Sequence, residues 1–164
     1  MTRTLAFALI VVTWAACAST TGMGGPNMSG HDEPPPASDI QSNDILAREA
    51  DAGRTRVQHI LISWREMGPA FGGGIDPRAR QRTRDQADKL AADLLARVRG
   101  GEDMTQLMSQ FSEDGGSSGT GESYEVTPDA KLVFEFKRMG LRLKLGEAGL
   151  VMSKYGWHIM KRVE

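Results

Sequence analysis

The sequence is poor in the residues that build disulfide frameworks and metal clusters. Its 164 residues include one cysteine and three histidines. A single thiol excludes an intramolecular disulfide, so the folded part of the chain depends on its core alone. No H-x-H or H-x-x-x-H spacing places two histidines on one element. Zinc held by His59, His158 and an aspartate is an alternative, but we expect neither a metal nor another cofactor.

Long apolar runs are also missing. The most apolar stretch covers only residues 5–14, which is too short to cross a bilayer as a mature helix. It follows the basic start Met1-Thr2-Arg3-Thr4 and precedes the small residues Ala15-Ala16. This order is typical of a secretory signal peptide, which we assign to residues 1–16.

The lone cysteine directly follows this segment. Ala15-Ala16-Cys17 resembles the lipobox of bacterial lipoproteins, in which the thiol is acylated and the preceding peptide is removed, although Trp14 stands where leucine is usual. The resemblance implies lipidation at Cys17 and an exported, membrane-anchored protein facing the periplasm. Ala18 in place of aspartate favours the outer membrane. The alternative is an ordinary signal peptide cut near Ala16 or Ala18.

Charge and composition then divide the chain. Residues 17–53 contain many glycines and prolines, with six acidic residues and one basic residue, a net charge of −5. They predict a flexible acidic tether, with a short helix over residues 40–50. Residues 54–164 carry 18 basic and 15 acidic residues. Their small positive excess is too weak to indicate a nucleic-acid partner.

Three short runs in the folded part predict β-strands. Residues 56–63 form the first, and residues 150–152 and 157–163 form a hairpin around a turn at Tyr155-Gly156. Period-two alternation places His158 on the face opposite Trp157.

Helices are predicted between these strands. An apolar stripe at helical spacing runs from Ala87 to Val98, and Asp103 caps a second helix that ends near Phe111. Thr127-Pro128-Asp129 predicts a third helix reaching about Met139, with Leu132, Val133 and Phe136 as its buried face. Glycines in residues 64–76 predict a mobile loop. Strands, helices and a closing hairpin indicate a small α+β domain with a largely antiparallel sheet.

Three motifs carry a resemblance to a known family. They are Val57-Gln58-His59-Ile60-Leu61-Ile62, Phe111-Ser112-Glu113-Asp114 and Gly156-Trp157-His158-Ile159-Met160, with Gly146-Glu147 before the last. In this order and spacing they resemble the parvulin family of peptidyl-prolyl isomerases over residues 54–164. The resemblance implies a four-stranded sheet with helices packed around it.

The same resemblance implies site residues. His59 and His158 match the paired histidines at the centre of the family's sheet. Ser153 matches the hydroxyl that is hydrogen-bonded to this pair, and Asp114 matches the polar group beside the reactive bond. Leu132 and Phe136 match the pocket that receives the proline ring. The residue that forms the third wall of the family's proline pocket corresponds to Tyr124 in an ungapped alignment, or to Ser123 after a one-residue shift.

Two further clusters have simpler interpretations. Arg78, Arg80, Arg82 and Arg84 alternate along the chain, so on a helix they scatter instead of forming one phosphate-binding face, and we expect a solvated helix start. The glycines at 115, 116, 119 and 121 lack the Gly-Lys-Ser/Thr sequence of a phosphate loop and predict a mobile active-site loop.

The sequence therefore predicts a peptidyl-prolyl isomerase of the bacterial envelope that assists the folding of exported proteins. Its partners would be X-Pro segments of unfolded or envelope proteins, together with the membrane reached through acylated Cys17. A non-catalytic, chaperone-like module that binds proline-containing or unfolded segments is the main alternative. A purely structural lipoprotein is a more distant one.

Overall fold

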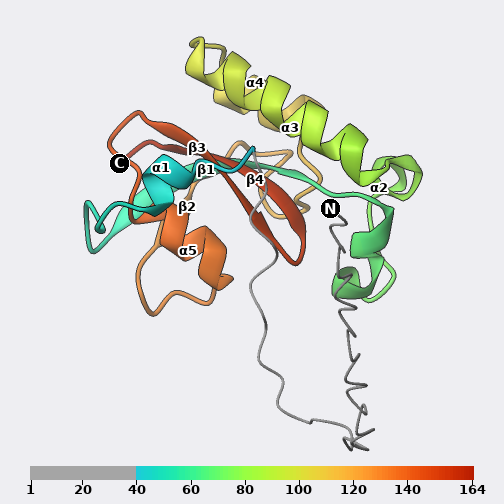
Figure 1. Cartoon of the computed structure of the whole chain (residues 1–164), viewed down its shortest axis with the longest axis horizontal. Coiled ribbons are helices and arrows are strands. Elements are labelled where there is room, and N and C mark those ends of the chain that lie inside the picture. Colours follow the sequence, from blue (N-terminus) through green and yellow to red (C-terminus); the bar gives the residue numbers. More distant parts are fainter. Residues whose placement is uncertain (1–39) are drawn as a thin grey trace, which may run out of the picture. The chain divides into compact units, whose positions relative to one another are not determined.

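The computed structural model describes residues 40–164 (Figure 1). The predicted signal peptide, the lipidation site Cys17 and the tether up to residue 39 lie outside the described residues. Within residues 40–164, no helix has both the length and the apolarity that a membrane span requires.

A four-stranded antiparallel sheet forms the centre of the domain and confirms the predicted α+β class. Its strands are β1 (Thr55–Ile62), β2 (Tyr124–Val126), β3 (Ala148–Ser153) and β4 (Gly156–Arg162), in the order β2-β1-β4-β3. β1 pairs with β4 so that Ile60 faces Ile159 and Leu61 faces His158. The first and last strands of the sequence therefore lie side by side in the middle of the sheet (Figure 1).

One face of the sheet packs against α3 (Arg84–Arg99) and α4 (Met104–Phe111), which cross it together in Figure 1. The predicted stripe from Ala87 to Val98 is buried here against Trp157 and Ile159. Thr83 and Gln86 form a capping box at the start of α3, and Asp103 accepts a hydrogen bond from the Gln106 amide at the start of α4. The apolar stripe predicted the first of these helices and Asp103 the start of the second, whereas the capping box at Thr83 was not predicted.

The opposite face packs against α1 (Asn43–Leu46) and α5 (Phe134–Gly140). Gly149 in β3 allows this close packing, because a Cβ atom there would lie 2.9 Å from the sulfur of Met139 and 3.1 Å from a side-chain carbon of Ile45. The two histidines of β1 and β4 belong to this face, together with Val57, Val151 and Met160.

The predicted start of the third helix is wrong. α5 begins at Phe134, and its N-cap Val133 is extended. The Thr127 hydroxyl donates to Asp129 instead of capping a helix, and the Ala130 amide closes a turn on the Thr127 carbonyl. Leu132 and Val133 therefore precede α5 on an irregular segment and are half-buried.

The segment between β1 and α3 is also more ordered than a simple loop. It contains a 3-10 helix, η1 (Arg65–Phe71), and a short helix, α2 (Pro77–Gln81), that Asp76 caps through the Arg78 amide. The Arg65 amide donates to the Arg82 carbonyl at 3.1 Å and closes the base of the segment.

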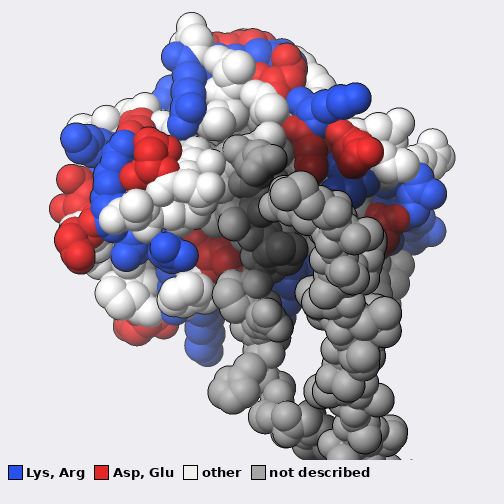
Figure 2. Space-filling model, viewed as in Figure 1, with Lys and Arg blue, Asp and Glu red and all other residues white. Residues whose placement is uncertain are grey.

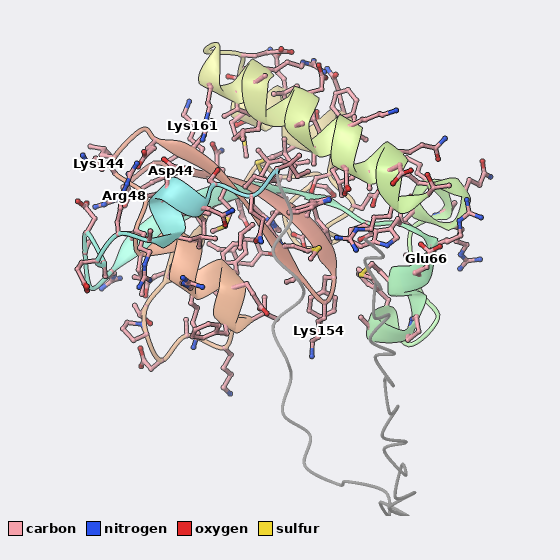
Figure 3. All side chains as sticks on the ribbon, in the orientation of Figure 1. Asp44, Arg48, Glu66, Lys144, Lys154 and Lys161 are labelled. Atoms are coloured by element: carbon pink, nitrogen blue, oxygen red, sulfur yellow. The ribbon has the colours of Figure 1, made fainter. Side chains whose placement is uncertain are left out.

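The β3–β4 hairpin is confirmed, but its turn residues are Lys154-Tyr155. Gly156 instead opens β4 with φ of 125°, a conformation that favours glycine. A Cβ atom there would lie 2.5 Å from the Ile62 carbonyl oxygen. Lys154 points outward from the hairpin tip (Figure 3).

The residues that lead into α1 cover the outer edge of β3. Ser42 donates its amide hydrogen to the Leu150 carbonyl, and its hydroxyl accepts from the Leu150 amide, both at 3.0 Å. The Gln41 side chain accepts from the Met152 amide at 3.2 Å. The folded unit thus includes residues before 54. The short helix predicted over residues 40–50 is confirmed, although it spans only Asn43–Leu46.

Candidate active site

Two buried histidines from neighbouring strands form the centre of the candidate site. The Nδ1 atoms of His59 and His158 are 3.3 Å apart, and their rings stack at 25° with centroids 5.4 Å apart. They meet because His59 pairs with Met160 across the ladder and His158 with Leu61, so the two side chains are diagonal neighbours on one face.

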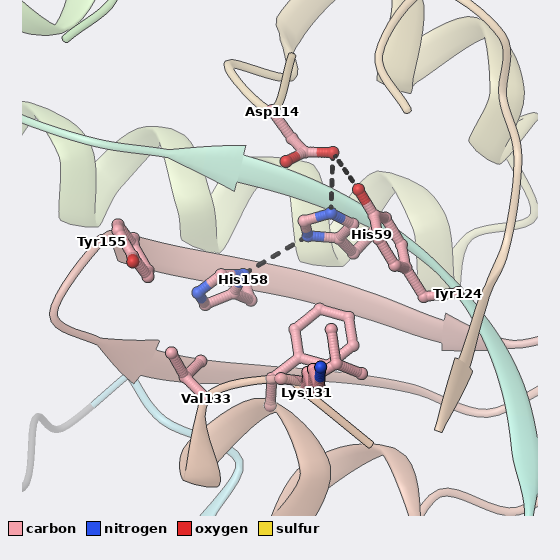
Figure 4. Close-up of a pocket in the computed structure, with 9 residues that line it drawn as sticks. His59, Asp114, Tyr124, Lys131, Val133, Tyr155 and His158 are labelled. Carbon is pink, nitrogen blue, oxygen red and sulfur yellow. Dashed lines mark hydrogen bonds and ion pairs between the residues drawn. The ribbon is translucent and has the colours of Figure 1, made fainter. Parts of the chain in front are cut away.

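Hydrogen bonds extend this pair in both directions, and Figure 4 shows the contacts on the side of Asp114. On one side, His59 Nε2 lies 3.3 Å from Asp114 Oδ2. On the other, His158 Nε2 lies 2.7 Å from Ser153 Oγ, which accepts the Tyr155 amide hydrogen at 3.1 Å. With both rings neutral, one arrangement satisfies every nitrogen. Ser153 donates to His158, His158 donates to His59, and His59 donates to Asp114.

Burial determines the charge of His158. The side chain is 4% exposed, and burial, aided by repulsion from His59, lowers the pKa of His158 to about 3, while Asp114 opposes the shift. His158 is therefore neutral at neutral pH.

Asp114 is held as a carboxylate. Its Oδ2 atom accepts hydrogen bonds from the Ser117 amide at 3.0 Å, the Ser117 hydroxyl at 2.7 Å and the Tyr124 hydroxyl at 2.9 Å. Burial alone would raise the pKa of Asp114, but hydrogen bonds from His59, Ser117 and Tyr124 place this pKa well below its usual range. Burial and the same contact with Asp114 raise the pKa of Tyr124 to about 12.

A pocket of about 210 Å³ lies beside this network (Figure 4). Its lining comprises His59, Asp114, Tyr124, Lys131, Leu132, Val133, Phe136, Tyr155 and His158. Phe136 packs edge-on against both imidazoles, at centroid distances of 5.0 Å and 5.4 Å, and Tyr124 packs edge-on against His59 at 5.2 Å. The pocket thus combines an aromatic surface with one fixed negative charge.

The structure brings the predicted site residues together. Six of them line the pocket, whereas Ser153 lies behind His158 and contacts it from β3. Of the two candidates for a third wall, Tyr124 lines the pocket, whereas the hydroxyl of Ser123 accepts a hydrogen bond from Arg56.

Sequence reasoning missed Lys131, Val133 and Tyr155 as lining residues, as well as the contact from Ser117. Lys131 and Val133 were missed because the predicted helix included them, whereas they precede α5 in the structure. Tyr155 was assigned only to the hairpin turn.

The four arginines of residues 78–84 bond to the protein itself. Arg78 donates to Asp76 and to the carbonyls of Gln110 and Ser112. Arg80 donates to the Ile75 and Gly73 carbonyls, and Arg84 lies over the Trp64 ring. Arg82, with 13% of its side chain exposed, bonds to Ser63 and Glu113, so the prediction of a solvated position is wrong for this residue.

Charges of both signs intermix on the face of the domain seen in Figure 2. In the part of the chain that the structure describes, no three His, Cys, Asp or Glu side chains are grouped so that they could hold a metal ion.

The stacked histidines, the aspartate and the aromatic pocket, on an antiparallel sheet of order β2-β1-β4-β3, define a parvulin-type peptidyl-prolyl isomerase domain. Residues 43–164 match the sequence model of the PPIC-type PPIASE domain, and the chain belongs to this family.

Curated relatives include a foldase protein PrsA from Geobacillus kaustophilus, 35% identical over 75 residues, and a chaperone SurA from Pseudomonas aeruginosa, 35% identical over 106 residues. These matches cover 45% and 64% of this chain but only 27% and 22% of the relatives' own lengths. The fold is similar to that of the peptidyl-prolyl isomerase ESS1 from Candida albicans. That match has a TM-score of 0.55 and 22% identity, and it covers 70% of this chain and 64% of that chain.

Proposed function

We propose that this chain accelerates cis/trans isomerisation of X-Pro bonds in exported polypeptides at the bacterial cell envelope, without a cofactor. The observation that carries the proposal is the pocket in which Phe136 and Tyr124 pack edge-on around His59, directly beside the carboxylate of Asp114. Membership of the PPIC-type family supports the reaction class.

The reaction requires no covalent bond to the enzyme. Rotation about an X-Pro bond takes tens of seconds or longer because twisting the amide breaks its resonance, at a barrier of about 20 kcal/mol. The twisted amide is less polar than the planar one, so an apolar surface that removes water from the proline ring favours the twisted state. In this proposal, Leu132, Phe136 and Tyr124 provide that surface.

The polar groups divide into two roles. Asp114 carries a fixed charge at the pocket and sets the electric field beside the substrate amide as its carbonyl and nitrogen change charge. His59, His158 and Ser153 are buried, and their mutual hydrogen bonds keep the two central strands and the pocket in shape. All four are proposed as the polar set of the active site.

The envelope location rests on the N-terminal sequence and on the relatives. In this proposal residues 1–16 form the signal peptide, acylated Cys17 anchors the chain in the outer membrane, and the acidic residues that follow link the anchor to the domain, whose folded unit already includes Gln41 and Ser42. The names of the relatives, foldase and chaperone, support the proposal that the substrates are polypeptides in the course of folding.

One observation favours the alternative of a binding module without turnover. Asp114 Oδ2 already accepts hydrogen bonds from Ser117 and Tyr124 and lies 3.3 Å from His59 Nε2. A carboxylate so occupied has less capacity to respond to a twisting amide, while the aromatic pocket would still hold proline.

Exchange NMR on X-Pro peptides separates the two functions. Wild-type protein at catalytic concentration should accelerate cis/trans exchange, and a panel that varies the residue before proline would define its preference. Peptide binding without acceleration would establish the binding module instead.

A further inference from the structure

A buried ion pair lies directly behind the active-site aspartate. Arg82 Nη1 lies 2.6 Å from Glu113 Oε1, and the Glu113 side chain is 1% exposed. The other carboxylate oxygen of Glu113 accepts the Ser63 amide hydrogen at 2.7 Å. Burial raises the pKa of Glu113, and the bonds from Ser63 and Arg82 oppose that rise. Such complete burial of a carboxylate, with both oxygens matched to donors, indicates a built arrangement and not a surface contact.

Ser63 joins this ion pair to Tyr155, a second residue that lines the pocket. Its amide donates to Glu113, its carbonyl accepts from Arg82 at 2.6 Å, and its hydroxyl donates to the Tyr155 carbonyl at 2.5 Å. Tyr155 lines the pocket from the hairpin turn, and Asp114 is the residue after Glu113. One fully buried serine thus connects two lining residues that are distant in sequence.

The backbone around Glu113 is tied to the same strand end. The Glu113 amide donates to the Leu61 carbonyl at 2.9 Å, and the Leu61 amide donates to the Ser112 hydroxyl at 3.1 Å. That hydroxyl also accepts the Asp114 amide hydrogen at 3.3 Å. The position of Asp114 therefore depends on how the segment of Ser112 and Glu113 lies along the end of β1.

We propose that Arg82, Glu113 and Ser63 form a positioning unit for the isomerase pocket, which holds Asp114 and Tyr155 at a fixed separation. The proposal rests on the function proposed above. In this proposal Arg82 is a positioning residue, which holds Glu113 and Ser63 and does not bind an anionic group of the substrate. The Arg65 amide donates to the Arg82 carbonyl at 3.1 Å, which fixes the backbone of Arg82 at the base of the segment between β1 and α3.

The test compares two matched glutamates. Glu113→Gln cannot satisfy both donors, because an amide offers one acceptor atom where the carboxylate offers two. Glu147 makes the same kinds of contact elsewhere, with the Arg48 guanidinium at 2.8 Å and the Lys144 amide at 2.9 Å, and it does not line the pocket. Figure 3 shows Arg48 and Lys144 on the side of the domain that carries α1. Glu147→Gln is therefore the control.

Two readouts are needed, kcat/KM for an X-Pro peptide and the pKa of Asp114 from its carboxyl carbon shift. Glu113→Gln should lower kcat/KM by about tenfold or more, since small displacements of positioned groups have effects of this size. It should also raise the pKa of Asp114. Removal of a neighbouring negative charge would by itself lower that pKa, so a rise reports altered geometry. Glu147→Gln should change neither quantity.

Ser63→Ala provides a second variant that removes only the hydroxyl donor to Tyr155. It should lower kcat/KM by a few fold with a smaller effect on Asp114, and it decides the matter should Glu113→Gln fail to fold. The proposal is overturned if Glu113→Gln, or Ser63→Ala in its place, retains wild-type kcat/KM while folded. Should the wild type lack isomerase activity, the proposed function fails, whereas the Asp114 pKa and the affinity for the peptide still test the positioning unit.

Discussion

The Tyr124 hydroxyl donates a hydrogen bond of 2.9 Å to Asp114, from a strand at one edge of the sheet to the loop that follows α4. This contact joins the two parts of the pocket that differ most in chemistry, its aromatic wall and its fixed charge. The same tyrosine therefore contributes a ring and a hydroxyl whose effects are separable.

Tyr124→Phe should keep the ring and lose the hydroxyl. The pKa of Asp114 should rise because one of its donors is gone, and kcat/KM should fall by no more than about tenfold, the value of one hydrogen bond. Tyr124→Ala should lower kcat/KM further, because it also removes the ring. Ser123→Ala is the control for the shifted alignment, and a larger loss there than in Tyr124→Ala would show that the wall is misassigned.

Phe136→Ala should remove most of the isomerase activity, because it deletes the ring that packs against both histidines. The side chain is buried, so the free energy of unfolding should also fall, by about 3–5 kcal/mol. Activity must be compared where circular dichroism shows the variant folded. The adjacent Phe134 is 68% exposed, and Phe134→Ala serves as the matched variant. Full activity in folded Phe136→Ala would place the proline site elsewhere.

Acid should destabilise the domain through His158. Its pKa of about 3 lies below the usual value near 6.5, so between these values the unfolded chain binds a proton that the folded chain does not. Stability is therefore lost as pH falls from about 6.5, by at most about 1.4 kcal/mol per pH unit from this group. Asp114 adds a loss in the same direction below about pH 4.

Urea unfolding of wild type and His158→Gln from pH 7 to pH 4.5 checks this expectation. The variant should be less stable at pH 7, since Ser153 and His59 lose their partner, and it should show a shallower pH dependence. Parallel curves for the two proteins would contradict a neutral, buried His158.

Preference for an acidic or phosphorylated residue before proline should stay below about tenfold, or 1.4 kcal/mol. The arginines of residues 78–84 bond to acceptors within the protein, which leaves Lys131 as the cationic lining residue in the described part of the chain. Rates on Glu-Pro, phosphoserine-Pro and Ala-Pro peptides give the ratio directly. A larger ratio that collapses on Arg78→Ala or Arg80→Ala would reassign these arginines to the substrate.

Lipidation at Cys17 is tested by fractionation. The Cys17→Ser protein should leave the membrane fraction or accumulate as an unprocessed precursor. Wild-type protein that is recovered without lipid and cut after Ala18 would support an ordinary signal peptide.

The features predicted correctly from sequence are those with local causes. The stripe of α3, the cap at Asp103 and the alternation around His158 each act within a few residues. The meeting of His59 and His158 came from the resemblance, since no local signal pairs residues so far apart. The predicted start of α5 was wrong because the Thr127 hydroxyl bonds to Asp129 instead of capping a helix. No neighbouring residue in the sequence indicates which of the two bonds forms. The arrangement of Arg82, Glu113 and Ser63 depends on tertiary packing and was missed for that reason.

The cover that Gln41 and Ser42 place on β3 has a consequence for a protein whose proposed clients are unfolded chains. An uncovered strand edge of this length would offer its backbone amides and carbonyls to any extended polypeptide and recruit it as a fifth strand. With the Leu150 and Met152 amides already bonded, a client gains nothing by pairing along β3. Strand addition by a client is thereby blocked at these positions of β3, which forms one of the two edges of the sheet.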